Sequence, residues 1–393
     1  MNANLWLLTA AQSLFLINNA VFIAINGLVG LSIAPVGWMA TLPVMGYVVG
    51  GAMSTSLVSK TQSAWGRKWA FQSGLVTALG SSLLCAWAVA HHQFALLIAG
   101  TVIAGYYNAN AQLYRFAAAE LAAPNFKEKA VSLVLAGGIA GGVAGPSMAA
   151  YTRNWTETPF VGAYLALAAV AVAAMVVVGF IQFPAAPKRH GHQDHGRPLR
   201  EIMRQPIFMV AALSAALSYG VMNLLMAATP LAMQTCGLAF SSTALVLEWH
   251  IIGMFAPGFF TGHLIKRFGA LPVMGVGVLL NLVCVVVALS GTDLSQFLIA
   301  LFTLGVGWNF VFTGSTTLSL KAYAPEEKDR AQGAINFFVF ATMAVTSFAS
   351  GALVTTQGWT LLNLGSIPAI ALMGAALVWL AKQPSPAQGP QAT

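Results

Sequence analysis

Charged side chains are scarce in this sequence. Of its 393 residues, 7% are Asp, Glu, Lys or Arg, whereas 58% are hydrophobic. A soluble domain usually carries about a quarter charged residues. So few charges cannot cover the surface of a water-soluble protein of this length. The composition therefore excludes a soluble globular protein and predicts that lipid contacts most of the surface.

Cysteine is also rare, which limits the possible covalent and metal chemistry. Cys85, Cys236 and Cys284 lie far apart, inside or beside apolar runs, and no two cysteines share a C-x-x-C spacing. A disulfide framework and a structural zinc site both need closely grouped cysteines. The sequence therefore predicts neither.

The net charge of +8 does not indicate a nucleic-acid-binding protein. Its basic residues are scattered over short connectors between apolar stretches and form no basic domain. We therefore expect a lipid bilayer and no nucleic acid among the partners.

Long apolar runs dominate the chain. A membrane-spanning helix needs roughly 20 apolar residues. Dividing the sequence at charges, prolines and polar clusters predicts twelve spans, at 5–29, 34–58, 69–90, 94–118, 130–151, 160–183, 206–234, 242–265, 271–291, 295–319, 331–355 and 360–381.

The distribution of Lys and Arg predicts the orientation of these spans. If the chain crosses the membrane at each span, only Arg153 of the 18 basic residues falls in a connector on one side. Connectors rich in Lys and Arg normally remain in the cytoplasm. We therefore expect a multi-pass protein of a bacterial inner membrane with both termini cytoplasmic.

An internal repeat divides the chain into halves. Residues 123–130 and 324–331 both have the form A-P-x-x-K-acid-base-A, about 201 positions apart. Parallel repeats of this kind are typical of one large class of secondary transporters. The sequence thus predicts an all-α membrane protein with a six-helix bundle at 1–183, a cytoplasmic linker at 184–205, and a second six-helix bundle with a short tail at 206–393.

Two four-residue spacings stand out in the second half. Met222 and Met226 form M-x-x-x-M in the seventh span, and His250 and Met254 form H-x-x-x-M in the eighth. A spacing of four places both members on one helix face. Counting along the helices places Met226 and His250 at the same depth, roughly 12–15 Å from the outer surface, with Met222 and Met254 level one turn further in. Three thioethers and an imidazole form a soft ligand set suited to Cu(I).

The same residues also have a simpler interpretation. Methionine is ordinary in membrane helices, and a buried histidine is often a hydrogen-bonded packing residue. The first half, however, carries no matching motif at the equivalent positions. A motif required by the fold would recur in both halves, so its confinement to one half favours a site.

Other polar or small residues at membrane depth are open to more than one interpretation. Glu248 is the one acidic residue placed well inside a span, and Arg115 lies inside the fourth. Asn19 and Asn108 either line a cavity or form interhelical hydrogen bonds. The glycine-rich stretch at 137–146 predicts close helix contact.

Several segments resemble a known family. Residues 262–269 (Gly-His-Leu-Ile-Lys-Arg-Phe-Gly) resemble the signature loop of the major facilitator superfamily. Together with Tyr114-Arg115-Phe116 and Gly307-Trp308-Asn309-Phe310, the two methionine motifs resemble those of the CcoA-type copper importers in that superfamily. The resemblance implies a major facilitator fold and transient copper ligands at Met222, Met226, His250 and Met254, with Cys236 as a related thiol.

The resulting hypothesis is a secondary transporter, not an enzyme, that imports copper, as Cu(I), into the cytoplasm and supports copper supply to cytochrome oxidase. Copper would be the transported substrate, and we expect a monomer with no permanently bound cofactor. The alternative is a proton-coupled exporter of a small organic compound, with Glu248 and Arg115 as its charged elements. The linker histidines, His190, His192 and His195, with Asp194, could hold a metal, but a solvated linker is the preferred interpretation.

Overall fold

The computed structural model describes residues 3–123, 127–183, 196–324 and 327–383. Regular secondary structure in these ranges is helical throughout, as the sequence predicts. The helices of the first half are α1 (Ala3–Ile33), η1 (Gly37–Met39), α2 (Leu42–Ala90), α3 (Phe94–Ala111), α4 (Tyr114–Leu121), α5 (Lys127–Thr152) and α6 (Val161–Phe180). Those that follow are α7 (Leu199–Met203), α8 (Pro206–Thr235), α9 (Phe240–Phe255), α10 (Gly258–Phe268), α11 (Ala270–Ser290), α12 (Leu294–Ser319), α13 (Lys328–Thr356) and α14 (Gly358–Ala381).

Each of the twelve predicted spans has a helical counterpart. Within the described ranges, ten helical segments are long and apolar enough to cross a membrane. One of them, at 37–90, contains two predicted spans. Gly66 has φ +73° and bends α2 between these two spans, so they can cross the membrane in turn. Helices α3 and α4 together supply the remaining span.

Two predicted spans are interrupted at positions where no break was predicted. The span at 94–118 breaks between α3 and α4, at Gln112 and Leu113. The span at 242–265 breaks between α9 and α10, at Ala256 and Pro257. Proline lacks a backbone N–H and clashes with the preceding turn, which explains the second break.

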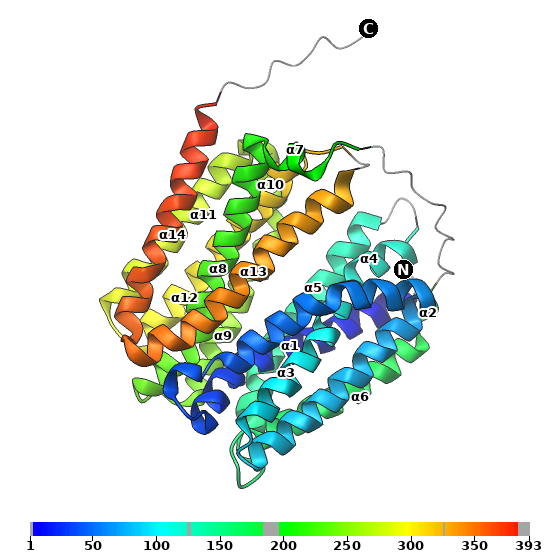
Figure 1. The fold of residues 1–393 in the computed structure, drawn as a ribbon, viewed down its shortest axis with the longest axis vertical. Coiled ribbons are helices and arrows are strands. Elements are labelled where there is room, and N and C mark those ends of the chain that lie inside the picture. The colour runs from blue at the N-terminus through cyan, green and yellow to red at the C-terminus, as the bar shows by residue number, and fades with distance from the viewer. Residues whose placement is uncertain (1–2, 124–126, 184–195, 325–326, 384–393) are drawn as a thin grey trace.

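The helices form two groups, α1 to α6 and α8 to α14 (Figure 1). The N-terminus, the C-terminal end and α7 lie toward one end of the molecule (Figure 1). The connectors at 34–41, 153–160 and 236–239 lie at the other end, which we call the distal end.

Contacts between the two groups cluster toward the distal end. The Ser147 hydroxyl on α5 donates a hydrogen bond to the Glu248 carboxylate on α9. The Gly351 N–H on α13 donates to the Thr41 hydroxyl oxygen at 3.0 Å. The rings of Phe160 and Phe240 pack edge-on with centroids 5.1 Å apart. These contacts close the halves against each other at the distal end.

The predicted linker is helical near its end. Its histidines and Asp194 lie outside the described residues, but α7 forms at Leu199–Met203, within the predicted range 184–205. Pro198 precedes the helix and its carbonyl accepts the first turn's hydrogen bond. Proline is well tolerated at a helix start.

Candidate functional site

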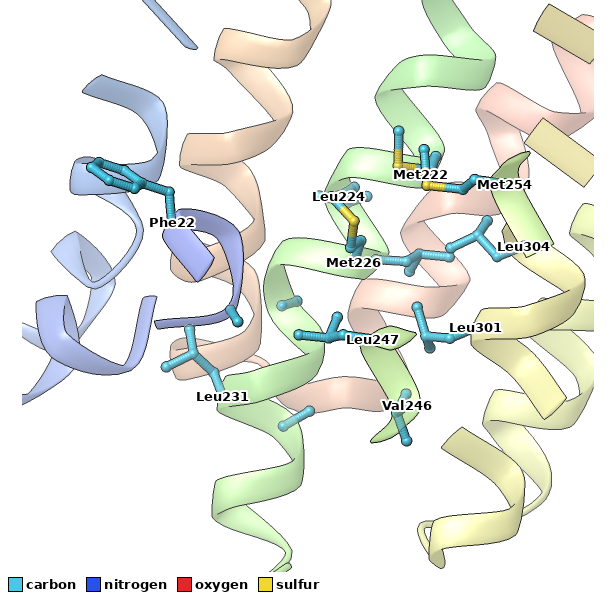
Figure 2. Close-up of a cluster of buried hydrophobic side chains, with 14 of the residues drawn as sticks. Phe22, Met222, Leu224, Met226, Leu231, Val246, Leu247, Met254, Leu301 and Leu304 are labelled. Atoms are coloured by element: carbon cyan, nitrogen blue, oxygen red, sulfur yellow. The ribbon is translucent and has the colours of Figure 1, made fainter. Parts of the chain in front are cut away.

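The predicted copper ligands are all buried. Their exposed fractions are 2% for Met222, 6% for Met226, 0% for His250 and 7% for Met254. The three methionines belong to a large hydrophobic cluster that includes buried residues of α8, α9 and α12 and also of first-half helices such as α1. Met222 and Met254 point toward each other between α8 and α9, and Met226 lies one turn further along α8 (Figure 2). None of the four side chains therefore faces lipid.

His250 is turned toward α12. Its Nδ1 lies 2.6 Å from the carbonyl oxygen of Leu301. Because a carbonyl can only accept, Nδ1 carries the ring proton and Nε2 has the free lone pair. Nε2 is buried and has no hydrogen-bond partner among the residues that the structure describes. An imidazole fixed through one nitrogen with the other free is the usual form of a metal ligand.

The methionine and histidine side chains do not line an open passage in this structure. Helices α9 and α12 pack closely here: a Cβ atom added at Gly305 of α12 would lie only 2.6 Å from the His250 carbonyl oxygen of α9. Helix α12 supplies the partner of His250, and all four side chains are buried, so access to them requires a conformational change.

Glu248 occupies a different face of α9 from His250. Its carboxylate accepts a hydrogen bond from Ser147, which belongs to the other half of the molecule. Glu248 is half-buried, and its contact is one of those that hold the distal end closed.

Three other predicted residues lie away from the methionines. Cys236 is exposed and caps the distal end of α8, ten residues beyond Met226, or about 15 Å along the helix axis. Asn19 is half-buried on α1. Asn108 is half-buried on α3, and its side-chain oxygen accepts a hydrogen bond from Gln112 at 3.5 Å. The structure does not bring these residues together with the buried ligand set.

Arg115 is a cation without an acidic partner in the described parts of the chain. Its guanidinium lies over the ring of Phe116, 4.9 Å from the centroid, and its side chain is exposed. It is also close enough to Tyr219, on α8 of the other half, for the two groups to interact electrostatically.

Tyr219 belongs to an aromatic cluster that sequence reasoning missed. Its ring packs edge-on against Trp308 and Phe312 of α12, with centroid separations of 5.2 and 5.3 Å. Trp308 and Phe312 are stacked, 5.1 Å apart and 10° from parallel. We call these three residues the aromatic wall. Only Trp308 lay in a stretch that the sequence analysis quoted, and no sequence signal joins Tyr219 to the other two.

Sequence comparison finds a relative that is named by its substrate and a more distant one that is uncharacterized. The chain is 34% identical over 372 residues to the riboflavin transporter RfnT of Brucella anthropi, and the match covers 94% of both chains. It is 25% identical to the uncharacterized MFS-type transporter YddS of Bacillus subtilis, over 87% of this chain and 82% of the relative.

Solved structures share the fold at low sequence identity. The nucleoside transporter NupG superposes with a TM-score of 0.80 at 11% identity, covering 97% of this chain and all of NupG. A bacterial metal transporter superposes with a TM-score of 0.71 at 14% identity, covering 98% of this chain and 99% of that one. These likenesses confirm the predicted fold class and show the fold alone.

The sequence model of the Major Facilitator Superfamily matches residues 5–258 and 211–393, which together include nearly the whole chain. With the 34% identical relative, this match shows that the chain belongs to the Major Facilitator Superfamily of membrane transporters.

Proposed function

We propose that this protein carries a small organic compound with a planar heteroaromatic ring system across the membrane, and that riboflavin is the first compound to test. The observation that carries the proposal is the 34% identity, over 94% of both chains, to a protein named a riboflavin transporter. That relative favours the organic-substrate alternative over the copper hypothesis drawn from the methionine motifs.

The environment of Arg115 supports an organic substrate. A charged side chain at membrane depth is costly, and such residues commonly mark a substrate pathway. Arg115 has no carboxylate within ion-pair distance in the described ranges, and it faces Tyr219 of the opposite half. A guanidinium is a rigid fork of donors that pairs with carbonyl or anionic oxygens. A substrate bound here would contact both halves.

Contact with both halves fits transport by alternating access, in which the two halves rock about a central site. The distal contacts are formed in this structure, so the site would be reached from the end where the termini lie. Closing around the substrate at that end would bring Arg115 and the aromatic wall together. The distal contacts, including Ser147 to Glu248, would then have to separate.

The test is riboflavin uptake by a bacterium that needs riboflavin and lacks its own importer. Expression of this protein should support growth and accumulation of labelled riboflavin. Arg115→Gln should reduce the uptake rate at least 10-fold, whereas Arg204→Gln, which changes an arginine beyond α7, should not. Absence of riboflavin movement in both uptake and efflux assays would refute riboflavin as the substrate.

Proton coupling is a separate part of the proposal and rests on Glu248. Its carboxylate accepts a hydrogen bond from Ser147 of the other half, and this contact must break when the distal end opens. Glu248→Gln keeps a hydrogen-bonding side chain but removes the titratable proton. We expect transport by this variant to lose its dependence on a pH gradient. Unchanged dependence would exclude Glu248 as the proton carrier.

Copper remains a second candidate substrate because of one observation. The buried Nε2 of His250 has no hydrogen-bond partner among the described residues, and Met254 lies one turn away on the same helix. If copper is carried, Met226→Leu and His250→Gln should each abolish copper uptake, whereas Glu248→Gln and Arg115→Gln should not. Met→Leu nearly preserves volume and removes the sulfur, so it separates ligation from packing. Copper uptake by the wild type no greater than that of cells without the protein would remove copper from consideration, and unchanged uptake in both variants would exclude Met226 and His250 as ligands.

A further inference from the structure

We propose that the aromatic wall of Tyr219, Trp308 and Phe312 is a binding subsite for the planar heteroaromatic ring of the substrate, with Arg115 of the other half closing over the ring. This inference deepens the proposed function and rests on it. It assigns the ring, and not a sugar-like or aliphatic chain, to the second half of the molecule.

The packing of the wall gives each ring a distinct role. Trp308 is only 6% exposed and lies almost parallel to Phe312. Tyr219 and Phe312 are half-buried, so parts of both rings remain uncovered. Trp308 therefore fixes the orientation of Phe312 from behind, while Tyr219 and Phe312 present the contact surface. Rings held in this way lose little conformational freedom when a ligand binds.

The neighbours of the wall cover its rings only in part. Tyr219 and Phe312 pack against a small cluster formed by Ala215 and Ala216 of α8 and Val339 of α13, together with Ile335 and Met343 of α13. Both rings remain half-buried. Arg115 of the first half is close enough to Tyr219 for the two groups to interact electrostatically, and we place the substrate ring between them.

The chemistry of these groups selects an aromatic ligand. Aromatic rings prefer offset-stacked or edge-to-face contact with other rings, at centroid separations of about 4.5–7 Å. The guanidinium of Arg115 can stack on a ring or donate to carbonyl and ring-nitrogen acceptors at its edge. A flat ring with acceptors along one edge uses both the aromatic surface and the guanidinium, whereas a saturated hydrocarbon chain uses neither.

The experiment measures binding of three compounds to the purified full-length protein. Riboflavin carries a tricyclic ring and a ribityl chain, lumichrome is a closely related tricycle without the chain, and ribitol is the chain without the ring. Quenching of flavin and lumichrome fluorescence reports the first two, and competition reports the third. We expect riboflavin and lumichrome to bind and ribitol not to compete.

Variants then locate the ring. Tyr219→Leu and Phe312→Leu should each raise the Kd for both riboflavin and lumichrome about 10-fold, a change equivalent to about 1.4 kcal/mol. Tyr219→Phe keeps the ring and should bind within about twofold of wild type. Phe302→Leu is the matched control, because Phe302 lies on the same helix but packs against Trp249, 6.1 Å away, and should bind normally.

The possible failures are distinguishable. If wild type transports riboflavin while both leucine variants bind it normally, the subsite is wrong and the proposed function stands. If ribitol competes with riboflavin and lumichrome does not bind, the protein recognises the ribityl chain and not the ring, and the subsite is wrong. If wild type neither transports nor binds any of the three compounds, the subsite and riboflavin as substrate both fail. Circular dichroism of each variant checks that the helices are intact.

Discussion

Arg197 and Glu327 form the best-defined ion pair at the end of the linker. The Arg197 guanidinium donates to both carboxylate oxygens at 2.8 and 2.7 Å, and its backbone N–H donates at 2.8 Å. The Ala324 N–H adds a fourth hydrogen bond at 2.9 Å. These donors, the Arg197 side chain foremost, lower the pKa of Glu327 to about 2. The pair fastens the chain before α7 to the start of α13.

This pair should make stability depend on pH in acid. Because the pKa of Glu327 is lower when folded than its ordinary value of 4.5, its contribution is fully present above about pH 4.5 and is lost as the pH falls toward about 2. We expect Glu327→Gln to have a lower Tm than wild type at pH 7. The difference should shrink progressively below pH 4.5, as measured by thermal unfolding in detergent.

The exposed carboxylate of Glu157 provides the control for this measurement. It lies in a distal connector, and Glu157→Gln should leave the Tm unchanged at pH 7. Equal Tm values for wild type and Glu327→Gln at pH 7 would contradict the assignment of Glu327 as a stabilising contact.

At the scale of elements, glycine determines how closely α1 and α5 approach. A Cβ built at Gly141 of α5 would lie 1.8 Å from the carbonyl oxygen of Ser13 on α1. One built at Gly137 would lie 2.2 Å from the Thr9 side chain. The close contact predicted for the stretch at 137–146 is therefore confirmed. Small residues allow helix backbones to pack closely where lipid supplies no hydrophobic driving force.

A methyl group at this contact should separate the two helices. Gly141→Ala must displace backbone atoms of α1, and overpacking of this kind costs about 1–3 kcal/mol. We expect a clearly lower Tm and less folded protein after solubilisation. Gly80→Ala on α2 is the matched control, because a Cβ there meets nothing within 4 Å and alanine favours helix. A Tm for Gly141→Ala equal to that of Gly80→Ala would refute the contact.

At the scale of the whole molecule, the distal contacts hold the two halves in a conformation that is closed at the distal end. Ser147 with Glu248, Thr41 with Gly351, and Phe160 with Phe240 each join the first half to the second. If the halves rock during transport, all of these contacts must open in every cycle. Locking one of them should stop transport without preventing substrate binding from the opposite end.

Cross-linking tests this requirement directly. Phe160→Cys with Phe240→Cys places thiols where rings now lie 5.1 Å apart between centroids, within reach of a short bifunctional thiol reagent. Cys236 is exposed and is replaced by serine first, whereas Cys85 and Cys284 are buried. We expect uptake to cease after cross-linking and to persist in the untreated double variant and in each treated single variant. Full transport by the cross-linked protein would exclude opening at the distal end.

The sequence by itself determined the class of protein and the positions of its twelve spans. Lipid offers no hydrogen-bond partners to the backbone, so each span must satisfy its own backbone groups as a helix. Length and hydropathy then suffice to locate the spans, because an α-helix makes its hydrogen bonds within one short stretch of chain. The same local information placed Met222, Met226, His250 and Met254 within the seventh and eighth spans. The orientation and the domain boundaries remain predictions.

Only the tertiary structure decided which helix faces meet. Sequence spacing placed the methionine motifs at similar depth, but α12 supplies the partner of His250 through the Leu301 carbonyl. The aromatic wall joins Tyr219 to Trp308 and Phe312, about 90 positions later, and Arg115 reaches it from the other half. The rotation of a helix about its axis, and the choice of its neighbours, depend on the packing of all the helices at once. No local pattern contains that information.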